Sequence, residues 1–424
     1  MTRYKIGEVE TSPGSPDFND LIERAYKDKV RPLCLCREPG LPMYIAHFEH
    51  GFLVKRMPDS GEEHAANCDS FETPAVLSGR GEVDGSAIQE NDAGLVSLKF
   101  AFSLRRNAPK DQAKEPTEHS SATASGTRLT LRAFLHYLWE ESKLTQWGPE
   151  KKLPSWFHVR RDLIKVAQAK ETNKAPLADV LYVPEYFDPT RKAEIFHRRT
   201  VQLSPIMGKG NFGKKMMVLV GEVENIQPAR YGWALNVKHL RDMPFKLSED
   251  LHQNFEKLFI LTMNLWDMVP TGHMMVAATF MMDASGAPDV QELVLMLTNN
   301  QWLPLENTYD LEFTTKLIEC QRSFNKNLRY NLTLDKPIAS AILTDVDGDP
   351  VPMYLDLGDL VSKWATSESI KNLIETSKLP AWVWDPLFGV PPSLPPKKMA
   401  SDVPMSASAH VVEPAHMMES AINA

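Results

Sequence analysis

Three cysteines and one histidine near the N-terminus are the residues of this 424-residue chain whose types and spacing best suit metal chemistry. They occur as Cys34-Leu-Cys36 and, 27 residues later, as His64-Ala-Ala-Asn-Cys68. Cysteine sulfur and histidine nitrogen are the ligands that tetrahedral Zn²⁺ prefers in proteins. The set therefore predicts a zinc site formed by all four residues.

Two short strands, predicted over 43–48 and 52–57 and joined by a turn, separate the two ligand pairs. A short helix that opens at Ser60 would place His64 and Cys68 four residues apart on one face. The hairpin would then bring the two pairs together. Because all four ligands come from the protein, the site would be closed, and a closed zinc site stabilises the fold without performing chemistry.

The same residues allow other interpretations. They could be three free thiols and a surface histidine, or Cys68 could form a disulfide with Cys34 or Cys36 in an oxidising compartment. His47 and His50 are spare candidates for the fourth ligand. Three cations that are close in sequence could offset the negative charge of a zinc site with three thiolates: Arg37, Lys55 and Arg56.

A basic, glycine-rich segment over 208–215 nearly spells a phosphate-binding loop. Lys215, however, stands where that pattern needs Ser or Thr, and a strand rather than a helix is predicted to follow. The segment is therefore interpreted as a basic loop that either contacts a nucleic-acid backbone or is simply solvated. The candidate nucleic-acid contacts are Arg198, Arg199, Lys209, Lys214 and Lys215.

Paired carboxylates offer an enzymatic hypothesis. Glu222 and Glu224 lie two apart on a predicted strand and would face the same way, so they could hold Mg²⁺ for phosphodiester chemistry. Asp345, followed by Val346 and Asp347, resembles the nucleophile motif of a phosphatase family, but too little chain follows it for that fold. The Asp347-Gly348 dipeptide between two apolar runs favours a hairpin turn instead.

Composition limits the class of protein. The net charge of −8 argues against a protein that coats nucleic acid over its whole surface, and 43% apolar residues support a sizeable core. No apolar run approaches the length of a membrane span, cysteines are few, and no apolar signal segment follows Met1. A cytoplasmic protein without membrane contact is therefore expected.

The predicted fold class is α+β, because strand pairs followed by helices occur twice, which favours antiparallel sheets over a parallel doubly wound sheet. A small zinc-stabilised β-hairpin module would precede a helical hairpin and an antiparallel mixed α/β domain. The predicted divisions are 1–75 (helix and zinc module), 76–127 (strand and disordered linker), 128–172 (helical hairpin), 173–358 (α+β domain), 359–390 (C-terminal helix) and 391–424 (disordered tail).

The apolar periodicity predicts individual elements within these divisions. Helices are expected over 17–30, 130–143, 251–263, 311–327 and 360–379, and a further helix begins at Ser155. Strands are expected over 95–104, 216–223, 233–237, 273–281, 290–297, 338–343 and 351–355. Leu261 and Cys320 are expected to be packed within their helices.

The helix that begins at Ser155 carries basic residues on its exposed side: Arg160, Arg161 and Lys165. A helix–loop–helix with such a second helix could read DNA. The loop before it is longer than the compact turn of that motif, so a helical hairpin that packs on the next domain is the alternative.

Segments spread along the chain resemble one known family. Leu33-Cys-Leu-Cys36, Val54-Lys-Arg-Met-Pro58 and Gly61-x-x-His64-x-x-x-Cys68, with looser matches at 301–304 and 339–345, resemble the bacterial domain-of-unknown-function family numbered 1173. That family occurs on plasmids and integrative conjugative elements. The resemblance implies a mobile-element setting and no particular reaction.

The leading hypothesis is a non-enzymatic, zinc-stabilised accessory protein of a mobile element that binds DNA or a partner protein. The contact surface would be the zinc module together with the basic loop. The alternatives are a Mg-dependent phosphodiester-acting enzyme and a scaffold that binds protein only.

Overall fold

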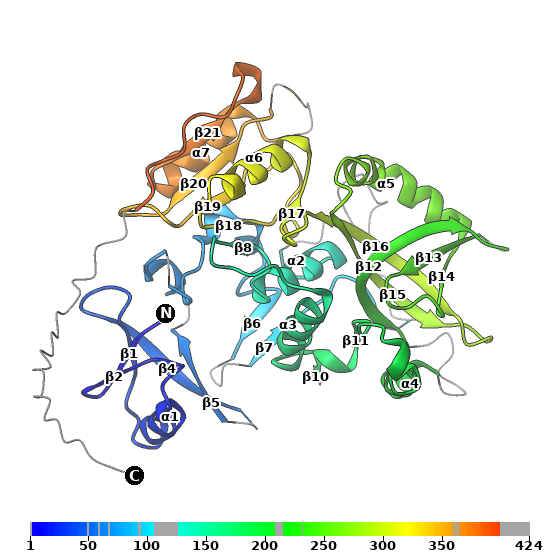
Figure 1. The fold of residues 1–424 in the computed structure, drawn as a ribbon, viewed down its shortest axis with the longest axis horizontal. Helices are drawn as coiled ribbons and strands as arrows, with labels where there is room; N and C mark the ends of the chain where they lie inside the picture. Colours follow the sequence, from blue (N-terminus) through cyan, green and yellow to red (C-terminus); the bar gives the residue numbers. More distant parts are fainter. Residues whose placement is uncertain are drawn as a thin grey trace, which may run out of the picture.

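The computed structural model describes residues 2–398 except 49–50, 58–59, 67, 92–94, 106–125, 208–214, 231, 359 and 361–363. It confirms the α+β class, since helices pack against several sheets with mainly antiparallel pairing (Figure 1). Almost all of the predicted linker, and the predicted tail beyond residue 398, lie outside the described residues. Within the described ranges, no helix has both the length and the apolar composition that a membrane span requires.

The N-terminal module is a five-stranded sheet with one helix packed on it. The predicted hairpin is confirmed, with its strands in register from Met43 opposite Arg56 to Phe48 opposite Gly51. The helix buries Phe18, Ile22 and Ala25 because these residues recur at helical spacing. The elements are β2 (Val9–Thr11), β1 (Tyr4–Ile6), β3 (Leu33–Cys34), β4 (Leu41–Phe48) and β5 (Gly51–Arg56), in sheet order, and α1 (Phe18–Lys27).

Two helices lie at the centre of the molecule. Thr130 caps the first by accepting a hydrogen bond from the Ala133 N–H at 3.1 Å. This helix is apolar on nearly all sides and is accordingly buried. The helices are α2 (Leu131–Glu141) and α3 (Trp156–Gln168), and beside them lies a sheet of β10 (Ala175–Pro176), β9 (Lys170–Thr172), β7 (Val96–Leu98) and β6 (Ile88–Glu90). Strand β7 is shorter than the predicted strand over 95–104.

The largest sheet closes on itself as a five-stranded barrel. Its path runs β12 (Met217–Pro228), β13 (Trp233–Val237), β14 (Phe245–Leu247), β16 (Pro288–Thr298), β15 (His273–Met282) and back to β12. The pairing of β14 with β16 is parallel, and α5 (Glu249–Asp267) connects β14 to β15, the third and fourth barrel strands in chain order. This strand order, with a helix at that position, is the topology of the OB-fold.

Alternation along the strands fills the barrel. Leu219, Leu235 and Phe245 point into its core, whereas Val218 and Met275 face outward and share a second core with α2 and α3. At a bulge between Val223 and Asn225, β12 turns away from β15 and continues its pairing with β13. Gly221 allows this bend, since a Cβ there would lie 2.7 Å from Val237 Cγ1.

Further elements flank the barrel: β11 (Leu181–Tyr182) beside β12, β17 (Pro304–Leu305) beside β16, and α4 (Lys192–Met207). Helix α5 confirms the predicted helix over 251–263. The prediction that Leu261 is buried is wrong, because its side chain is 74% exposed on the outer face of α5.

A last sheet contains β21 (Trp382–Trp384), β20 (Val351–Leu355), β19 (Ala341–Leu343), β18 (Phe324–Lys326) and β8 (Gln146–Trp147), with α6 (Thr308–Glu319) and α7 (Ser367–Ser377). The predicted helix over 311–327 is too long, because the chain leaves the helix after Glu319 and forms β18. Cys320 is consequently exposed at the helix end rather than packed within it.

The sequence predicts a disordered tail from residue 391 onward, but the first residues of this tail form hydrogen bonds with the rest of the chain. The carbonyl of Ser393 accepts a hydrogen bond from Trp382 Nε1 at 3.1 Å, and that of Pro395 accepts one from Arg322 Nη1 at 2.6 Å. Residues 391–398 are therefore fastened to the last sheet.

Candidate metal centre

The four predicted ligands come from two stretches of the N-terminal module. Cys34 ends β3, where it pairs with Tyr4 of β1 and Leu41 of β4, and Cys36 follows in the next turn. The predicted helix that carries both His64 and Cys68 is wrong. A short 3₁₀ turn ends at Glu63, and His64 is extended, with φ −69° and ψ 152°.

A tight turn replaces that helix. The Cys68 N–H donates to the Ala65 carbonyl at 2.8 Å, which folds the chain back toward His64. The two residues therefore meet through a turn rather than through one helical face. His64 and Cys68 lie close together, as predicted, although the local structure proposed for them is wrong.

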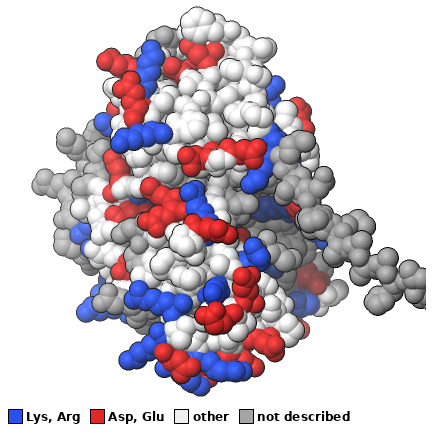
Figure 2. Space-filling model, turned by 90° about the vertical axis from the view of Figure 1, so that its left-hand side faces the viewer, with Lys and Arg blue, Asp and Glu red and all other residues white. Residues whose placement is uncertain are grey.

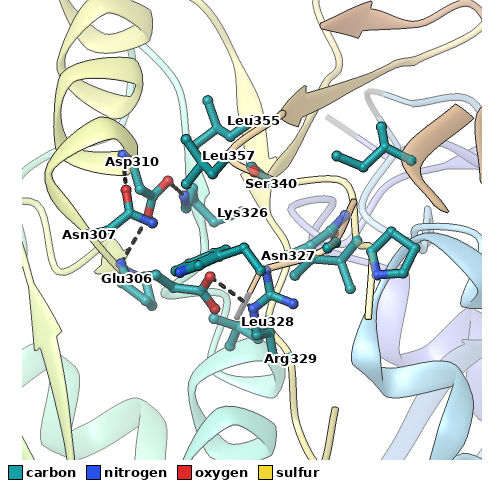
Figure 3. A pocket seen from close by; sticks show the side chains of 16 residues that line it. Glu306, Asn307, Asp310, Lys326, Asn327, Leu328, Arg329, Ser340, Leu355 and Leu357 are labelled. Carbon is teal, nitrogen blue, oxygen red and sulfur yellow. Dashed lines mark hydrogen bonds and ion pairs between the residues drawn. The ribbon is translucent and has the colours of Figure 1, made fainter. Parts of the chain in front are cut away.

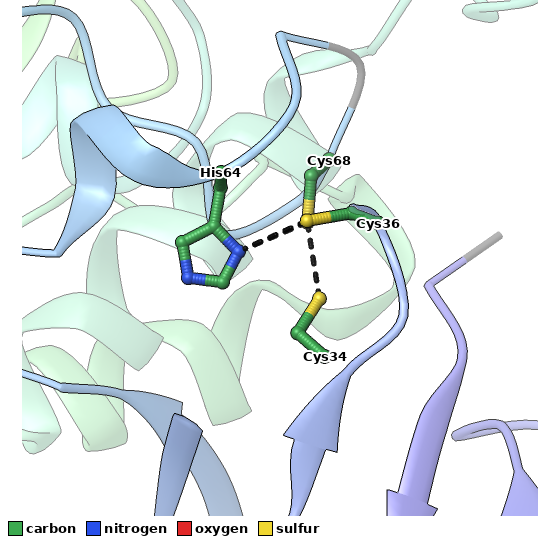
Figure 4. A group of neighbouring side chains, drawn as sticks. All are labelled: Cys34, Cys36, His64 and Cys68. Atoms are coloured by element: carbon green, nitrogen blue, oxygen red, sulfur yellow. Dashed lines mark hydrogen bonds between the residues drawn. The ribbon is translucent and has the colours of Figure 1, made fainter. Parts of the chain in front are cut away.

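The four side chains converge on one point (Figure 4). One ligand atom from each residue lies within 4.8 Å of the other three. Cys34 Sγ is 3.6 Å from Cys68 Sγ, and His64 Nδ1 is 3.3 Å from Cys36 Sγ and 3.7 Å from Cys68 Sγ. In a tetrahedron with zinc bond lengths, sulfur atoms are about 3.8 Å apart, and sulfur and nitrogen about 3.6 Å. The residues are close enough to bind one metal ion.

Neither of the two disulfides considered as alternatives to the zinc site is present. The separation between Cys34 and Cys68 far exceeds the S–S bond length of about 2.05 Å, and all three cysteines are free. Main-chain N–H groups approach two of the sulfurs, from Ala65 to Cys36 at 3.5 Å and from Ser70 to Cys68 at 3.4 Å. Such contacts stabilise thiolates, which are the metal-binding form of cysteine.

Burial makes this cluster costly without an ion. Cys34 and His64 are fully buried, and His64 Nε2 lacks a hydrogen-bond partner among the described residues. A hydrogen bond from Cys34 lowers the pKa of Cys68 to about 5, while the same contact and burial raise the pKa of Cys34. The opposite directions arise because the pair shares one proton. A dication would let all three sulfurs be thiolates together.

The three cations expected to offset the charge contact carboxylates. Arg37 pairs with Asp349 at 4.0 Å, Lys55 with Glu90 at 2.9 Å, and Arg56 with Glu72. The spare histidines do not join the cluster either. The ring of His47 stacks on Tyr26 at 5.7 Å, and His50 lies outside the described residues.

The candidate nucleic-acid contacts are only partly described. Arg198 pairs with Glu185 at 2.8 Å, and Arg199 pairs with Asp242 through both terminal nitrogens. Lys215 is exposed, and its main chain pairs with that of Arg105 in an isolated antiparallel β-bridge. Lys209 and Lys214 lie outside the described residues. On α3, Arg160 donates to the Val183 carbonyl at 3.1 Å, so the basic side of this helix is partly engaged within the molecule.

The carboxylates of the enzymatic hypothesis do not assemble into one site. Glu222 accepts hydrogen bonds from Lys238 Nζ at 2.6 Å and from His273 Nδ1 at 2.7 Å, whereas Glu224 pairs with Arg241. Burial alone would raise the pKa of Glu222, but these two hydrogen bonds outweigh it and lower the pKa. The third carboxylate belongs to another sheet.

That third carboxylate, Asp345, follows β19 and is held by the Arg322 guanidinium at 2.8 Å. The segment from Asp345 to Asp349 lies between β19 and β20, which pair as an antiparallel hairpin. The turn prediction for this segment is confirmed.

A pocket lined by both charged and apolar side chains lies beside α6 and β18 (Figure 3). Lys326 pairs with Asp310, and Arg329 Nε donates to Glu306 Oε2 at 2.9 Å. Arg329 also donates to the Lys336 carbonyl at 2.8 Å. Because these charged groups pair with one another, we attribute them to the stability of the fold rather than to the binding of a ligand. Sequence analysis missed it because the pairs join residues 16 and 23 positions apart.

Comparison with known proteins identifies a family for this chain, but it gives no function, cofactor or partner. Neither the curated proteins nor the solved structures contain a significant match to the chain. One family model, described as a protein of unknown function (DUF1173), matches residues 4–387. The match includes the whole candidate metal centre and every sheet described above. The chain belongs to this DUF1173 family.

Proposed function

We propose that this chain is a non-enzymatic accessory protein of a bacterial mobile element, stabilised by structural zinc, which binds DNA or a partner protein. The observation that carries the zinc part is the convergence of three sulfurs and one imidazole nitrogen within 4.8 Å. Soft thiolates with one imidazole at near-tetrahedral separations suit Zn²⁺ better than a hard cation such as Mg²⁺.

Zinc would act here by holding separate parts of the chain together. Cys34 and Cys36 flank the end of β3, whereas His64 and Cys68 belong to the loop after β5. The ion would therefore fasten that loop to the sheet. Four protein ligands leave no position for water or substrate, so the centre would contribute stability rather than catalysis. Three reduced thiols fit a cytoplasmic location.

The DNA-binding part rests on the mobile-element resemblance and on local charge. Residues 151–200 contain 11 Lys and Arg against 6 Asp and Glu, a net charge of +5 in a chain whose total is −8. The distribution of charge differs on the face that carries the N-terminal module. Lys and Arg are interspersed there with Asp and Glu (Figure 2). Charge therefore favours a nucleic-acid contact outside that face.

A binding experiment tests this part of the proposal. Fluorescence anisotropy with a labelled mixed-sequence duplex should show binding at about 50 mM salt that weakens steeply at about 200 mM, because phosphate contacts release counterions. Absence of binding to this duplex and also to a labelled single strand of equal length, even at the lower salt concentration, would remove the DNA-binding version. A partner protein of the mobile element would then remain as the proposed ligand.

A further inference from the structure

One outer face of the barrel is left open by the described helices. The outward side chains in the first part of β12 (Val218 and Val220) and those of β15 and β16 are buried with α2 and α3, whereas Asn225 and Gln227 in the last part of β12 are exposed. On β13 and β14, by contrast, Asn236 is half-buried and Lys246 is exposed. Figure 1 shows these two strands at the margin of the molecule, away from α2 and α3. They are the second and third strands of the barrel.

The position of this face in the barrel indicates a ligand-binding role. In OB-fold barrels the face of the second and third strands binds oligonucleotides and oligosaccharides. Fold alone does not establish a ligand, so the argument must rest on the residues present. Those residues are polar and small: Asn225, Gln227, Ala234, Asn236 and Lys246. Amide side chains can donate to and accept from base edges, and Ala234 leaves room for close approach.

Charge at this face matches a polyanion rather than a neutral sugar. Residues 225–246 contain four Lys and Arg and one Asp, a net charge of +3 for the segment. Three of these cations pair with carboxylates from outside the segment: Lys238 with Glu222, Arg241 with Glu224 and Lys246 with Asp283. Arg241 pairs with Glu224 at 2.6 Å, yet its side chain is 82% exposed, and Lys238 is 42% exposed beside Glu222. Exposed ion pairs contribute only about 0–1 kcal/mol, so phosphate groups can compete with Glu224 for the exposed Arg241 guanidinium.

An aromatic side chain stands next to these cations. Tyr186 packs on His239 with ring centroids 4.7 Å apart, and 53% of Tyr186 is exposed. His239 directly follows Lys238 and precedes Arg241 by two residues. Proteins that bind single strands combine a positively charged groove with aromatic rings on which unpaired bases stack. Bases in a duplex are already stacked and cannot use such a platform.

We infer that the outer face of β13 and β14, with Tyr186 and Arg241 at its edge, binds single-stranded nucleic acid. This inference rests on the proposed function, because it specifies which nucleic acid is bound and where. Arg241 and Lys238 contact phosphates, Tyr186 stacks on a base, and Asn236 contacts base edges along β13.

The N-terminal module supplies matched controls for both side chains. Tyr26 also stacks on a histidine, His47, and is 44% exposed. Arg3 also pairs with one glutamate, Glu10, and its side chain is 66% exposed. The test compares Tyr186→Ala with Tyr26→Ala, and Arg241→Glu with Arg3→Glu. Thermal melting of each variant checks that the fold is retained.

The measurement is anisotropy with a labelled oligothymidylate of about 16 nucleotides and with a duplex of equal length. The full-length protein should bind the single strand more tightly. Tyr186→Ala should weaken that binding roughly five- to 150-fold, the range that corresponds to loss of one base stack. Arg241→Glu should weaken it and lower the slope of log affinity against log salt by about 0.7. Tyr26→Ala and Arg3→Glu should bind like wild type.

Three results would overturn the inference. Equal or tighter duplex binding, unaffected by Tyr186→Ala and Arg241→Glu, would refute the single-strand site and leave the proposed DNA binding intact. Weaker binding by Tyr26→Ala and Arg3→Glu instead would place the contact on the N-terminal module. No binding of either nucleic acid at low salt would refute both the inference and the DNA-binding proposal.

Discussion

Lys326 and Asp310 form an ion pair in which each side chain is only 4% exposed. Burial raises the pKa of Asp310, and the neighbouring Lys326 charge opposes that rise. The Asp310 carboxylate also accepts the Glu306 N–H at 3.0 Å, so the pair is part of a wider network. Such a pair costs desolvation when formed, but losing one member leaves a buried charge without a partner.

The pair therefore predicts an asymmetry between single and double substitutions. Lys326→Met should lower the free energy of unfolding by about 3–5 kcal/mol, measured by urea denaturation at neutral pH. Combining it with Asp310→Leu should recover much of that loss, because no isolated charge remains. Arg161→Met, which removes an exposed cation from the partly exposed Asp162, should change stability by less than about 0.5 kcal/mol. If the double variant is as unstable as the single one, the buried-charge explanation is wrong.

At the scale of elements, Gly79 marks a close approach between two parts of the chain. Its N–H donates to the Leu328 carbonyl at 2.9 Å, and a Cβ at this position would lie 2.0 Å from the Arg329 carbonyl oxygen. The short 3₁₀ helix Gly79–Glu82 is thereby fixed against the segment after β18. Only a residue without a side chain fits there.

Gly79→Ala should consequently destabilise the protein by about 1–3 kcal/mol, since either backbone must shift to admit the methyl group. Thermal unfolding followed by circular dichroism measures the effect. Gly14→Ala is the matched control, because nothing lies within 4 Å of a Cβ at that position. Equal melting temperatures for the two variants would show that the approach at Gly79 is looser than described.

The elements also show which features a sequence can predict. The hairpin of β4 and β5 and the long strands β12, β15 and β16 were predictable, because apolar alternation and turn residues are local signals. The end of α6 was not. The chain leaves that helix through Gln321 in a left-handed conformation, with φ 52°, whereas Gly or Asn usually marks such a stop.

The candidate metal centre shows the same division. The types and spacing of Cys34, Cys36, His64 and Cys68 predicted which residues come together, because that prediction does not depend on one particular backbone path. They could not predict the path actually taken, a 3₁₀ turn and an extended His64 instead of a helix. The sequence could not predict the closure of the barrel either, since β14 and β16 pair at a single position, Lys246 opposite Asp289.

At the scale of the whole molecule, the N-terminal module has a small core of its own. Eight buried apolar residues form it, with Cys34 among them. The barrel and the central helices contribute much larger cores. Small cores rarely supply enough hydrophobic stabilisation alone, and a structural metal is a common supplement. Stability of the module should therefore depend on the ion, and stability of the barrel should not.

Removal of the metal should act locally for this reason. Chelation with EDTA should increase amide hydrogen exchange in β1, β3, β4 and β5, because the loop that carries His64 and Cys68 loses its attachment. Exchange in β12, β15 and β16 should stay slow. Hydrogen exchange followed by mass spectrometry measures both regions in one sample. A uniform increase over the whole chain would contradict this local role of the metal.

The central claim is that Cys34, Cys36, His64 and Cys68 hold one structural zinc ion. Metal analysis by mass spectrometry on untagged protein tests it most directly, with wild type, Cys36→Ser and Cys320→Ser compared. Cys320 is the matched control because it is a free, exposed cysteine outside the cluster. We predict about one zinc per chain in wild type and Cys320→Ser, and its loss together with a lower melting temperature in Cys36→Ser. Zinc-free wild type, or zinc retained in full by Cys36→Ser, would contradict the account.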